Sequence, residues 1–148
     1  MTPSIELSPL LPGHIPAVAA AEKQCFSDPW TYRMLADSFF NESVRTVAAE
    51  EDGRIVGYGF ITAAGEDADL ANIAVRETYR RKGIAGGILT ALEEEAVRSG
   101  VERMFLEVRV SNAAAMLLYL KHGYVGRYVR PRYYGDGEDA LIMEKPLK

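Results

Sequence analysis

The residues of this chain that are most suited to chemistry form a cationic turn before a glycine-containing helix start. Residues 80–87 read RRKGIAGG, so three cations stand directly before Gly83. The first amides of a helix have no partner within the helix and lie at the positive end of its dipole, where a pyrophosphate can accept them. The alternative is a solvated basic turn whose glycines serve helix packing.

Two common nucleotide-binding fingerprints do not match this turn. A Walker-type P-loop needs Gly, four residues, then Gly-Lys and a hydroxyl residue, and the sequence contains no such order. A Rossmann fingerprint needs Gly-x-Gly-x-x-Gly soon after the first strand. Gly83, Gly86 and Gly87 have a different spacing, so the residues alone leave the anion unnamed.

The composition restricts the class of ligand. The 148 residues include 17 Lys and Arg against 21 Asp and Glu, for a formal net charge of −4. Proteins that bind nucleic acid through its phosphates are usually basic, so a small anionic ligand is favoured over direct nucleic-acid binding. No apolar run is long enough to span a membrane, and the N-terminal residues lack a signal-peptide pattern. We therefore expect a cytoplasmic protein that does not bind a membrane.

Cysteine and histidine residues give little support for a metal. The single cysteine, Cys25, excludes an internal disulfide and a cysteine-rich zinc site. His14 and His122 have no metal-like spacing with other ligands, so both are expected to be structural. We expect Cys25 to be a small buried hydrophobe.

Hydrophobic periodicity and turn residues predict the element order β-α-α-β-β-β-α-β-α-β-β in one domain, residues 1–148. This order implies an α/β fold with a mixed sheet and helices on both faces. In the first helix, Ile15, Val18, Ala19 and Glu22 recur at helical spacing, and the helix breaks at Ser27-Asp28-Pro29. The expected strands are 5–7, 44–50, 54–62, 69–75, 104–110, 124–130 and 140–146, and the expected helices are 12–26, 31–40, 83–99 and 112–121.

The cationic turn resembles a known cofactor signature. Arg80-x-x-Gly83-x-Ala85, after a strand that ends at Val75, resembles the acetyl-CoA motif of the GCN5-related N-acetyltransferase (GNAT) superfamily. In that superfamily the turn binds the CoA pyrophosphate, and the backbone of the preceding strand pairs with the pantetheine arm. The resemblance implies acetyl-CoA as co-substrate, held by Ile73, Ala74 and Val75 on the strand and by Arg81, Lys82, Gly83, Ile84, Ala85 and Gly86 on the turn.

A narrower resemblance covers nearly the whole chain. The segments EKQCFSDPW (22–30), LEVRVSNAAA (106–115), LY (118–119) and RYYGDGEDA (132–140) resemble the RimI-type ribosomal-protein alanine N-acetyltransferases. These enzymes acetylate protein N-termini. The resemblance implies an acyltransferase whose partner is a protein or peptide N-terminus, such as that of a ribosomal protein.

Glu107 is the candidate general base. On its expected strand it shares a face with Phe105 and Arg109, while the alternate residues point the other way. From the residues alone, Glu107 is a glutamate on a wet sheet face or the ion-pair partner of Arg109; the resemblance implies catalysis. A protein α-amino group has a pKa of about 8, against about 10.4 for lysine, so a carboxylate acting directly or through a water suffices as the base.

Two residues of the following helix complete the expected chemistry. Tyr119 is a core tyrosine on the residues alone, and the resemblance implies a general acid hydrogen-bonded to the CoA sulfur. Because a phenol has a pKa near 10 and a thiol near 8.5, we expect the hydroxyl to act as a donor that stabilises charge on sulfur. A strand amide near Val75 is expected to hold the oxyanion. The resemblance implies that Asn112 contacts CoA; from the residues alone, Ser111 or Asn112 caps the helix, and Asn112 could do both.

Two segments are expected to bind the acceptor. The resemblance makes Tyr133 and Tyr134 ligands of the peptide backbone, although both also suit ordinary cross-strand packing. Phe26, Pro29 and Trp30 would form the opposite wall, although Trp30 alone also suits the core. Charged Glu138 and Asp139 would attract a basic peptide or are simply solvated.

The sequence thus predicts direct acetyl transfer from acetyl-CoA to a protein N-terminus, without a metal and without a covalent acyl-enzyme. Two alternatives stay open. One is acetylation of a small amine or a lysine side chain; an enzyme for small amines would not need the paired tyrosines. The other is a non-enzymatic acyl-CoA-binding module, against which the presence of both Glu107 and Tyr119 argues.

Overall fold

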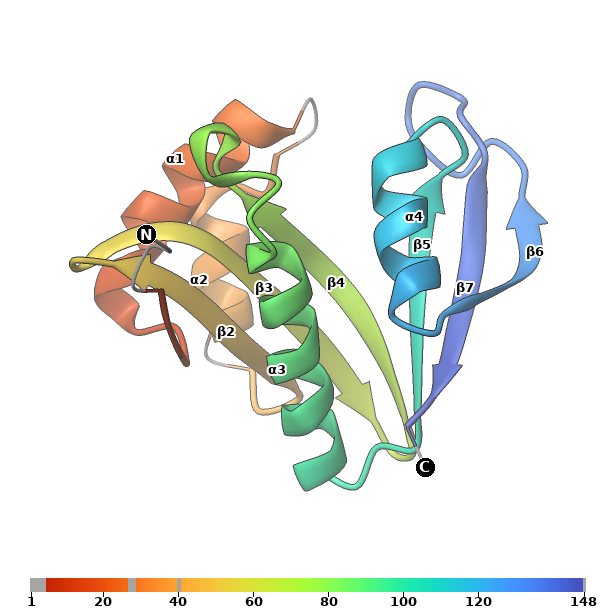
Figure 1. Ribbon diagram of the computed structural model, residues 1–148, viewed down its shortest axis with the longest axis horizontal. Coiled ribbons are helices and arrows are strands. Elements are labelled where there is room, and N and C mark those ends of the chain that lie inside the picture. The colour runs from red at the N-terminus through yellow and green to blue at the C-terminus, as the bar shows by residue number, and fades with distance from the viewer. Residues whose placement is uncertain (1–4, 27–28, 40, 148) are drawn as a thin grey trace.

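A mixed seven-stranded sheet with helices on both faces forms the centre of the structure (Figure 1). The computed structural model describes residues 5–26, 29–39 and 41–147. The elements follow the predicted order, with two short 3-10 helices in addition. Their bounds are β1 Glu6–Ser8, η1 Pro12–His14, α1 Ile15–Cys25, α2 Tyr32–Phe39, β2 Val44–Glu51, β3 Arg54–Ala64, β4 Asp67–Val75, η2 Glu77–Tyr79, α3 Ile84–Arg98, β5 Arg103–Arg109, α4 Ala113–Lys121, β6 Val125–Arg130 and β7 Ala140–Pro146.

The sheet divides into two parts because β4 and β5 separate. The strand order is β1-β2-β3-β4-β5-β7-β6, and β4–β5 is the parallel pair. These two strands pair only from Asp67–Arg103 to Asp69–Phe105, although β4 runs on to Val75 and β5 to Arg109. Figure 1 shows them converging near the C-terminus and diverging toward the opposite end. Beyond Asp69, the facing edges of β4 and β5 therefore lack each other as hydrogen-bond partners.

A bulge in β4 lies at the start of this separation. The register with β3 shifts between Phe60–Asn72 and Ile61–Leu70, so Ala71 is an extra residue on β4. A bulge of this kind bends its strand and increases the local twist. The bend directs the second half of β4 away from β5.

The two faces of the sheet carry separate cores. Helices α3 and α4 contribute Ile88, Leu92 and Tyr119 to one cluster, and α1 and α2 contribute Val18 and Leu35 to the other. Helix α3 lies very close to β3, because a Cβ placed on Gly59 would lie 2.9 Å from both Ile88 Cγ2 and Leu92 Cδ1. Glycine in β3 therefore permits the close packing of the helix that carries the cationic turn.

The predicted order and fold class are confirmed, with small differences at the ends of elements. The first helix begins as a 3-10 turn, and α1 runs from Ile15 to Cys25. Thr31 Oγ1 accepts the amide of Met34 at 3.1 Å, as expected of a cap. The expected break at Ser27-Asp28 and the expected helix end at Phe40 lie outside the described residues. No helix of the described part of the chain is long and apolar enough to cross a membrane.

Candidate active site

The separated edge of β4 presents backbone groups to the gap. The amide of Arg76 donates to the Val56 carbonyl at 2.8 Å, so residue 76 faces β3. Because hydrogen-bonding direction alternates along an antiparallel strand, Asn72 and Ala74 also face β3. Ile73 and Val75 then face the gap. Ile73, Ala74 and Val75 were predicted to pair with pantetheine. Of these, Ile73 and Val75 direct their backbone groups toward β5.

The start of α3 offers free amides next to this gap. The first hydrogen bond of the helix runs from the Gly87 amide to the Gly83 carbonyl at 3.1 Å, so the amides of residues 84–86 precede it. Gly83 has φ 80°, and a Cβ at this position would meet nothing within 4 Å. The side chain of Ile84 is buried in the core, so this residue offers the site its backbone.

Gly86 differs from Gly83 in what surrounds it. A Cβ on Gly86 would lie 2.9 Å from His122 Nε2 at the end of α4. Both residues line an open depression of about 770 Å³ along α3, together with Gly83, Gly87 and Lys121 among others. Because Gly86 has no side chain, the His122 ring can pack against α3 there. Because Gly83 has no side chain, the space beside it stays open.

The three cations of the turn have different partners. Arg80 is used internally, since Nε donates to the Val75 carbonyl at 3.0 Å and Nη2 lies 3.7 Å from Cys25 Sγ. Cys25 is therefore not the fully buried hydrophobe expected from the sequence, but a half-buried acceptor. Arg81 and Lys82 are exposed, and Lys82 Nζ lies 5.3 Å from the centroid of the Tyr79 ring. Arg81 and Lys82 are the two cations predicted to contact the cofactor.

Glu107 lies on β5 just beyond the last residue that pairs with β4. Its neighbours Leu106 and Val108 are buried in the α3–α4 cluster, so Glu107 projects from the opposite face, as predicted. The side chain is half-buried. Burial raises the pKa of Glu107, the negative charge of Asp69 raises it further, and Arg130 lowers it. A carboxylate with a raised pKa at the end of a gap is suited to accept a proton.

Tyr119 lies on α4, on the other face of the sheet from Glu107. It is 6% exposed and packs edge-to-face against Tyr124, with ring centroids 5.9 Å apart. Burial raises the pKa of Tyr119 to about 12, with a smaller contribution from Tyr134. No fully buried side-chain oxygen or nitrogen among the described residues lacks a hydrogen-bond partner, and no hydrogen bond of these residues uses the Tyr119 hydroxyl. Its oxygen is therefore accessible.

The Tyr134 ring lies 4.0 Å from the Arg109 guanidinium, and Arg109 follows Glu107 by two residues on the same face of β5. Burial raises the pKa of Tyr134, Arg109 lowers it, and the charge of Glu107 raises it. Tyr134 in turn raises the pKa of Tyr119. Tyr133 packs edge-to-face on Tyr134 at 5.1 Å between centroids, and its ring is exposed. The structure thus places the tyrosine pair at Arg109, on the face of β5 that also carries Glu107.

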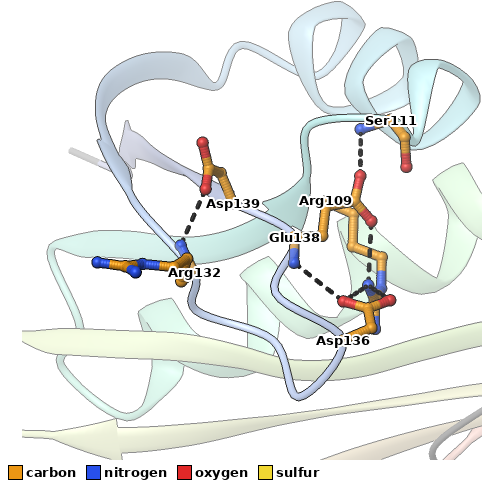
Figure 2. Close-up of polar contacts among 6 residues, drawn as sticks. All are labelled: Arg109, Ser111, Arg132, Asp136, Glu138 and Asp139. Atoms are coloured by element: carbon orange, nitrogen blue, oxygen red, sulfur yellow. Dashed lines mark hydrogen bonds and ion pairs between the residues drawn. The ribbon is translucent and has the colours of Figure 1, made fainter.

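Arg109 organises the segment between β6 and β7 that carries the tyrosines (Figure 2). Its Nη1 contacts Asp136 Oδ2 at 2.8 Å and Glu138 Oε1 at 3.0 Å. The possible pairing of Arg109 with Glu107 is therefore wrong, because the 131–139 segment folds back over β5 and supplies other carboxylates.

The acidic residues of this segment also have internal roles. Glu138 Oε2 accepts the Ser111 amide at 2.9 Å, and Asp139 Oδ1 accepts the Arg132 amide at 2.9 Å (Figure 2). Hydrogen bonds from Ser111 and Arg109 hold the pKa of Glu138 below its usual range. Neither Glu138 nor Asp139 is simply solvated, and both carboxylates have partners within the fold.

The expected opposite wall, Phe26, Pro29 and Trp30, follows α1. The Trp30 ring packs edge-to-face on Phe60 with centroids 5.0 Å apart, so it lies at the margin of the α1–α2 core. The Trp30 amide donates to Glu22 Oε1 at 3.0 Å. Phe26 is partly exposed beside the end of α1. The structure therefore confirms the alternative in which Trp30 packs on the core, and its role as a wall stays a prediction.

Sequence reasoning gave no role to Glu22, which is 0% exposed. Its carboxylate accepts the Tyr58 hydroxyl, and Asn72 Nδ2 donates to it at 2.8 Å. The signal was present, because Glu22 continues the helical spacing of Ile15 and Val18 on the buried side of α1. A charged residue on such a stripe indicates a partner within the fold.

Asn112 and His14 both make hydrogen bonds within the fold. Asn112 is the N-cap of α4, where its Oδ1 accepts the Ala115 amide at 3.1 Å, and its expected CoA contact stays a prediction. His14 has a structural role, as expected. Its Nδ1 accepts the Leu11 amide, and its Nε2 lies 3.1 Å from Glu50 Oε1. Among the described residues, no group of three or more His, Cys, Asp and Glu side chains is placed to hold a metal ion.

Comparison with known proteins identifies the class of this fold and site. Residues 15–124 match the model of the acetyltransferase (GNAT) family. The chain is 33% identical over 136 residues to the [ribosomal protein bS18]-alanine N-acetyltransferase of Escherichia coli K12, covering 90% of this chain and 91% of the relative. It is 40% identical over 113 residues to an N-alpha-acetyltransferase of Sulfurisphaera tokodaii, covering 67% of each chain.

A solved structure gives the same result. The crystal structure of the E. coli ribosomal-protein-S18-alanine N-acetyltransferase superposes with a TM-score of 0.89 at 32% identity, covering 97% of this chain and 94% of that one. The chain belongs to the GNAT family of acetyltransferases and is an acyltransferase, which confirms the resemblance inferred from its motifs. Members of this family use acetyl-CoA as the acetyl donor.

Proposed function

We propose that this protein transfers the acetyl group of acetyl-CoA to the N-terminal α-amino group of a protein, of the ribosomal-protein alanine type. The observation that carries the proposal is the position of Glu107 just past the end of the β4–β5 pairing, with the Tyr134 ring over Arg109 on the same face of β5. The relatives named for N-terminal acetylation, at 33% and 40% identity, support the same acceptor class.

The donor fits the features of the gap and the turn. The backbone groups of Ile73 face the gap and match the amide-rich pantetheine arm, whereas the Val75 carbonyl is already held by Arg80 Nε. The free amides of residues 84–86, with the exposed Arg81 and Lys82, match the pyrophosphate. Gly83 leaves space for its approach. Acetyl-CoA would therefore lie with its thioester toward Glu107 and Tyr119 and its phosphates at α3.

The reaction then needs one proton acceptor and one donor. Glu107 takes a proton from the α-ammonium group, directly or through a water, and the free amine attacks the thioester carbonyl carbon. The Val75 amide, which faces the gap, is the proposed donor to the oxyanion. Collapse of the tetrahedral species breaks the carbon–sulfur bond, and the Tyr119 hydroxyl hydrogen-bonds the leaving thiolate. The nitrogen releases its second proton to water, and the thiolate takes up a proton from water to leave as CoA thiol.

An N-terminal acceptor suits this arrangement better than a lysine side chain. An α-amino group has a pKa near 8, so a sizeable fraction is already neutral at physiological pH. A single carboxylate with a raised pKa is a sufficient base for such an amine. Lysine, with a pKa near 10.4, would demand a base of higher pKa or a stronger perturbation of the amine.

The test is acetylation of a peptide library in which the first two residues vary, analysed by mass spectrometry. We expect acetyl groups on α-amines, with Ala-initiated peptides among the substrates. Matched peptides with a blocked N-terminus and an internal lysine should stay unmodified, as should small free amines. Acetylation of the blocked peptides or of the small amines in preference to free N-termini would contradict the proposal.

A further inference from the structure

Glu22 is the buried acid of the α1–α2 side that the reaction above does not use. It is 0% exposed and accepts hydrogen bonds from three separate parts of the chain. The donors are the Trp30 amide at 3.0 Å, the Asn72 side chain at 2.8 Å and the Tyr58 hydroxyl. Desolvation and this hydrogen bond raise the pKa of Tyr58 far above its usual range, so Tyr58 remains a donor.

The first of these contacts fixes the expected acceptor wall. The Glu22 carbonyl accepts the Phe26 amide at 3.0 Å, and its carboxylate accepts the Trp30 amide. One residue therefore holds the backbone amides of both Phe26 and Trp30. The Trp30 ring is held from the other side by Phe60.

The second contact reaches the cofactor strand. Asn72 directly follows the β4 bulge and directly precedes Ile73, whose backbone faces the gap. Its side chain donates to Glu22 on the α1–α2 face of the sheet. The same carboxylate thus connects the wall that would bind the acceptor with the strand that would bind the donor.

We propose that Glu22 is a positioning residue that sets the distance between the acceptor wall of Phe26 and Trp30 and the donor-binding half of β4. It does so without touching either substrate. The proposal rests on the proposed function, because the wall matters only where an acceptor peptide binds there. A residue that served stability alone would not change the acceptor KM independently of the melting temperature.

Two substitutions separate size from hydrogen bonding. Glu22→Gln is nearly isosteric and keeps one acceptor for the Trp30 amide, provided that the Tyr58 hydroxyl turns to accept and the Asn72 amide reverses. Glu22→Ala removes all three side-chain contacts. We therefore expect a graded effect, with Glu22→Gln between the wild type and Glu22→Ala.

The first measurement does not depend on activity. Trp30 is the only tryptophan in the chain, so intrinsic fluorescence reports on the wall directly. We expect the emission of Glu22→Ala to shift to longer wavelength and to become more sensitive to acrylamide quenching. Glu22→Gln should show the same change to a smaller degree.

The second measurement is steady-state kinetics with an accepted N-terminal peptide. Loss of the hydrogen bonds to a charged group should raise the peptide KM of Glu22→Ala by about tenfold. The KM for acetyl-CoA should change by less than about threefold, because the Asn72–Phe60 strand pairing and the turn at Gly83 do not involve Glu22.

Val101→Ala is the matched control for lost stability. Val101 is 2% exposed and packs in the α3–α4 cluster, on the other side of the sheet from Glu22. This variant should melt at a lower temperature, with the Trp30 emission and the peptide KM of the wild type. Glu22 variants with wild-type Trp30 emission, or with a peptide KM no higher than that of Val101→Ala, would overturn the inference. A wild-type enzyme that acetylates no N-terminal peptide would instead overturn the proposed function, and Trp30 fluorescence would still test the wall.

Discussion

The guanidinium of Arg109 lies over the ring of Tyr134, 4.0 Å from its centroid, while it also binds the carboxylates of Asp136 and Glu138. One β5 side chain therefore holds both the acidic part and the aromatic part of the segment between β6 and β7. Glu107, two residues earlier on the same strand, faces the same side of the sheet. The candidate base and the candidate acceptor-binding segment are thus fixed relative to each other through two neighbouring positions of β5.

Substitution of Arg109 should loosen acceptor binding more than donor binding. In Arg109→Met the two carboxylates lose their common partner, and Tyr134 loses a planar cation that stacks on its ring. We expect the peptide KM to rise by about tenfold, as for the loss of a charged hydrogen bond, with little change in the KM for acetyl-CoA. Steady-state kinetics with each substrate varied in turn measures both values.

Arg109→Lys is the matched variant for this effect. Lysine keeps the positive charge but lacks the planar fork that reaches two carboxylates and stacks on an aromatic ring. Its peptide KM should lie between those of the wild type and Arg109→Met. Equal peptide KM values for all three proteins would show that the 131–139 segment does not bind the acceptor.

The pH dependence should respond in opposite directions to two charges near Glu107. Asp69 raises the pKa of Glu107 and Arg130 lowers it. Removing the negative charge in Asp69→Asn lowers the Glu107 pKa, so the basic form persists to lower pH and the acid limb of kcat/KM moves down. Removing the positive charge in Arg130→Gln raises this pKa, so the same limb moves up. Measuring kcat/KM across pH at low salt tests both signs, because salt screens such effects.

Glu107→Gln provides the reference for this pair. A glutamine cannot take the amine proton, so we expect kcat to fall by about a hundredfold or more, with the affinity for CoA nearly unchanged. The acid limb assigned to Glu107 should disappear in this variant. Wild-type turnover by Glu107→Gln across the pH range would show that another group is the base.

The element order could be predicted because it depends on local pattern. The alternation along β5 placed Glu107 opposite the buried Leu106 and Val108, and the structure agrees. The starts of α3 at Gly83 and of α4 at Asn112 could also be predicted, because a turn and a helix cap have characteristic local residues. These features need only neighbouring residues.

The parts that escaped prediction depend on contacts between distant segments. The residues of β4 do not by themselves indicate that its pairing with β5 ends at Asp69. The gap exists because the pairing ends there. The partners of Arg109 come from residues 136 and 138, after β6 has intervened in the chain. Glu22 was visible as a misplaced charge on an apolar stripe, but its partners in β3 and β4 were not. The resemblance to a family supplied roles that the spacing of residues alone left open.

Tyr119 should contribute a hydrogen bond and not a full proton. Its pKa of about 12 lies some 3.5 units above that of a thiol near 8.5, so complete transfer to the thiolate costs about 5 kcal/mol. We expect Tyr119→Phe to lower kcat by roughly ten- to a hundredfold, because the donor to the leaving sulfur is lost. The Kd for CoA, measured by calorimetry, should change less than kcat.

The pH profile gives an independent check on Tyr119. Because its pKa is raised, the wild-type rate should show no alkaline decline assigned to Tyr119 below pH of about 11. Tyr119→Phe should therefore keep the shape of the profile while lowering its height. A variant that raises only the peptide KM would reassign Tyr119 to acceptor binding.

Arg81 should affect binding of the donor more than its reaction. The residue is exposed beside the free amides of α3 and already has φ 63°, so Arg81→Ala adds no new backbone demand on the turn. Losing one charge-assisted contact to a pyrophosphate should weaken acetyl-CoA binding by about tenfold or more, with kcat at saturating acetyl-CoA nearly unchanged.

Arg127→Ala, on the exposed strand β6, removes the same charge far from the turn and is the control for general electrostatics. The binding loss of Arg81→Ala should shrink at high salt, since a contact between exposed charges is screened. A large fall in kcat with unchanged affinity would show that the turn does not hold the anionic end of the donor.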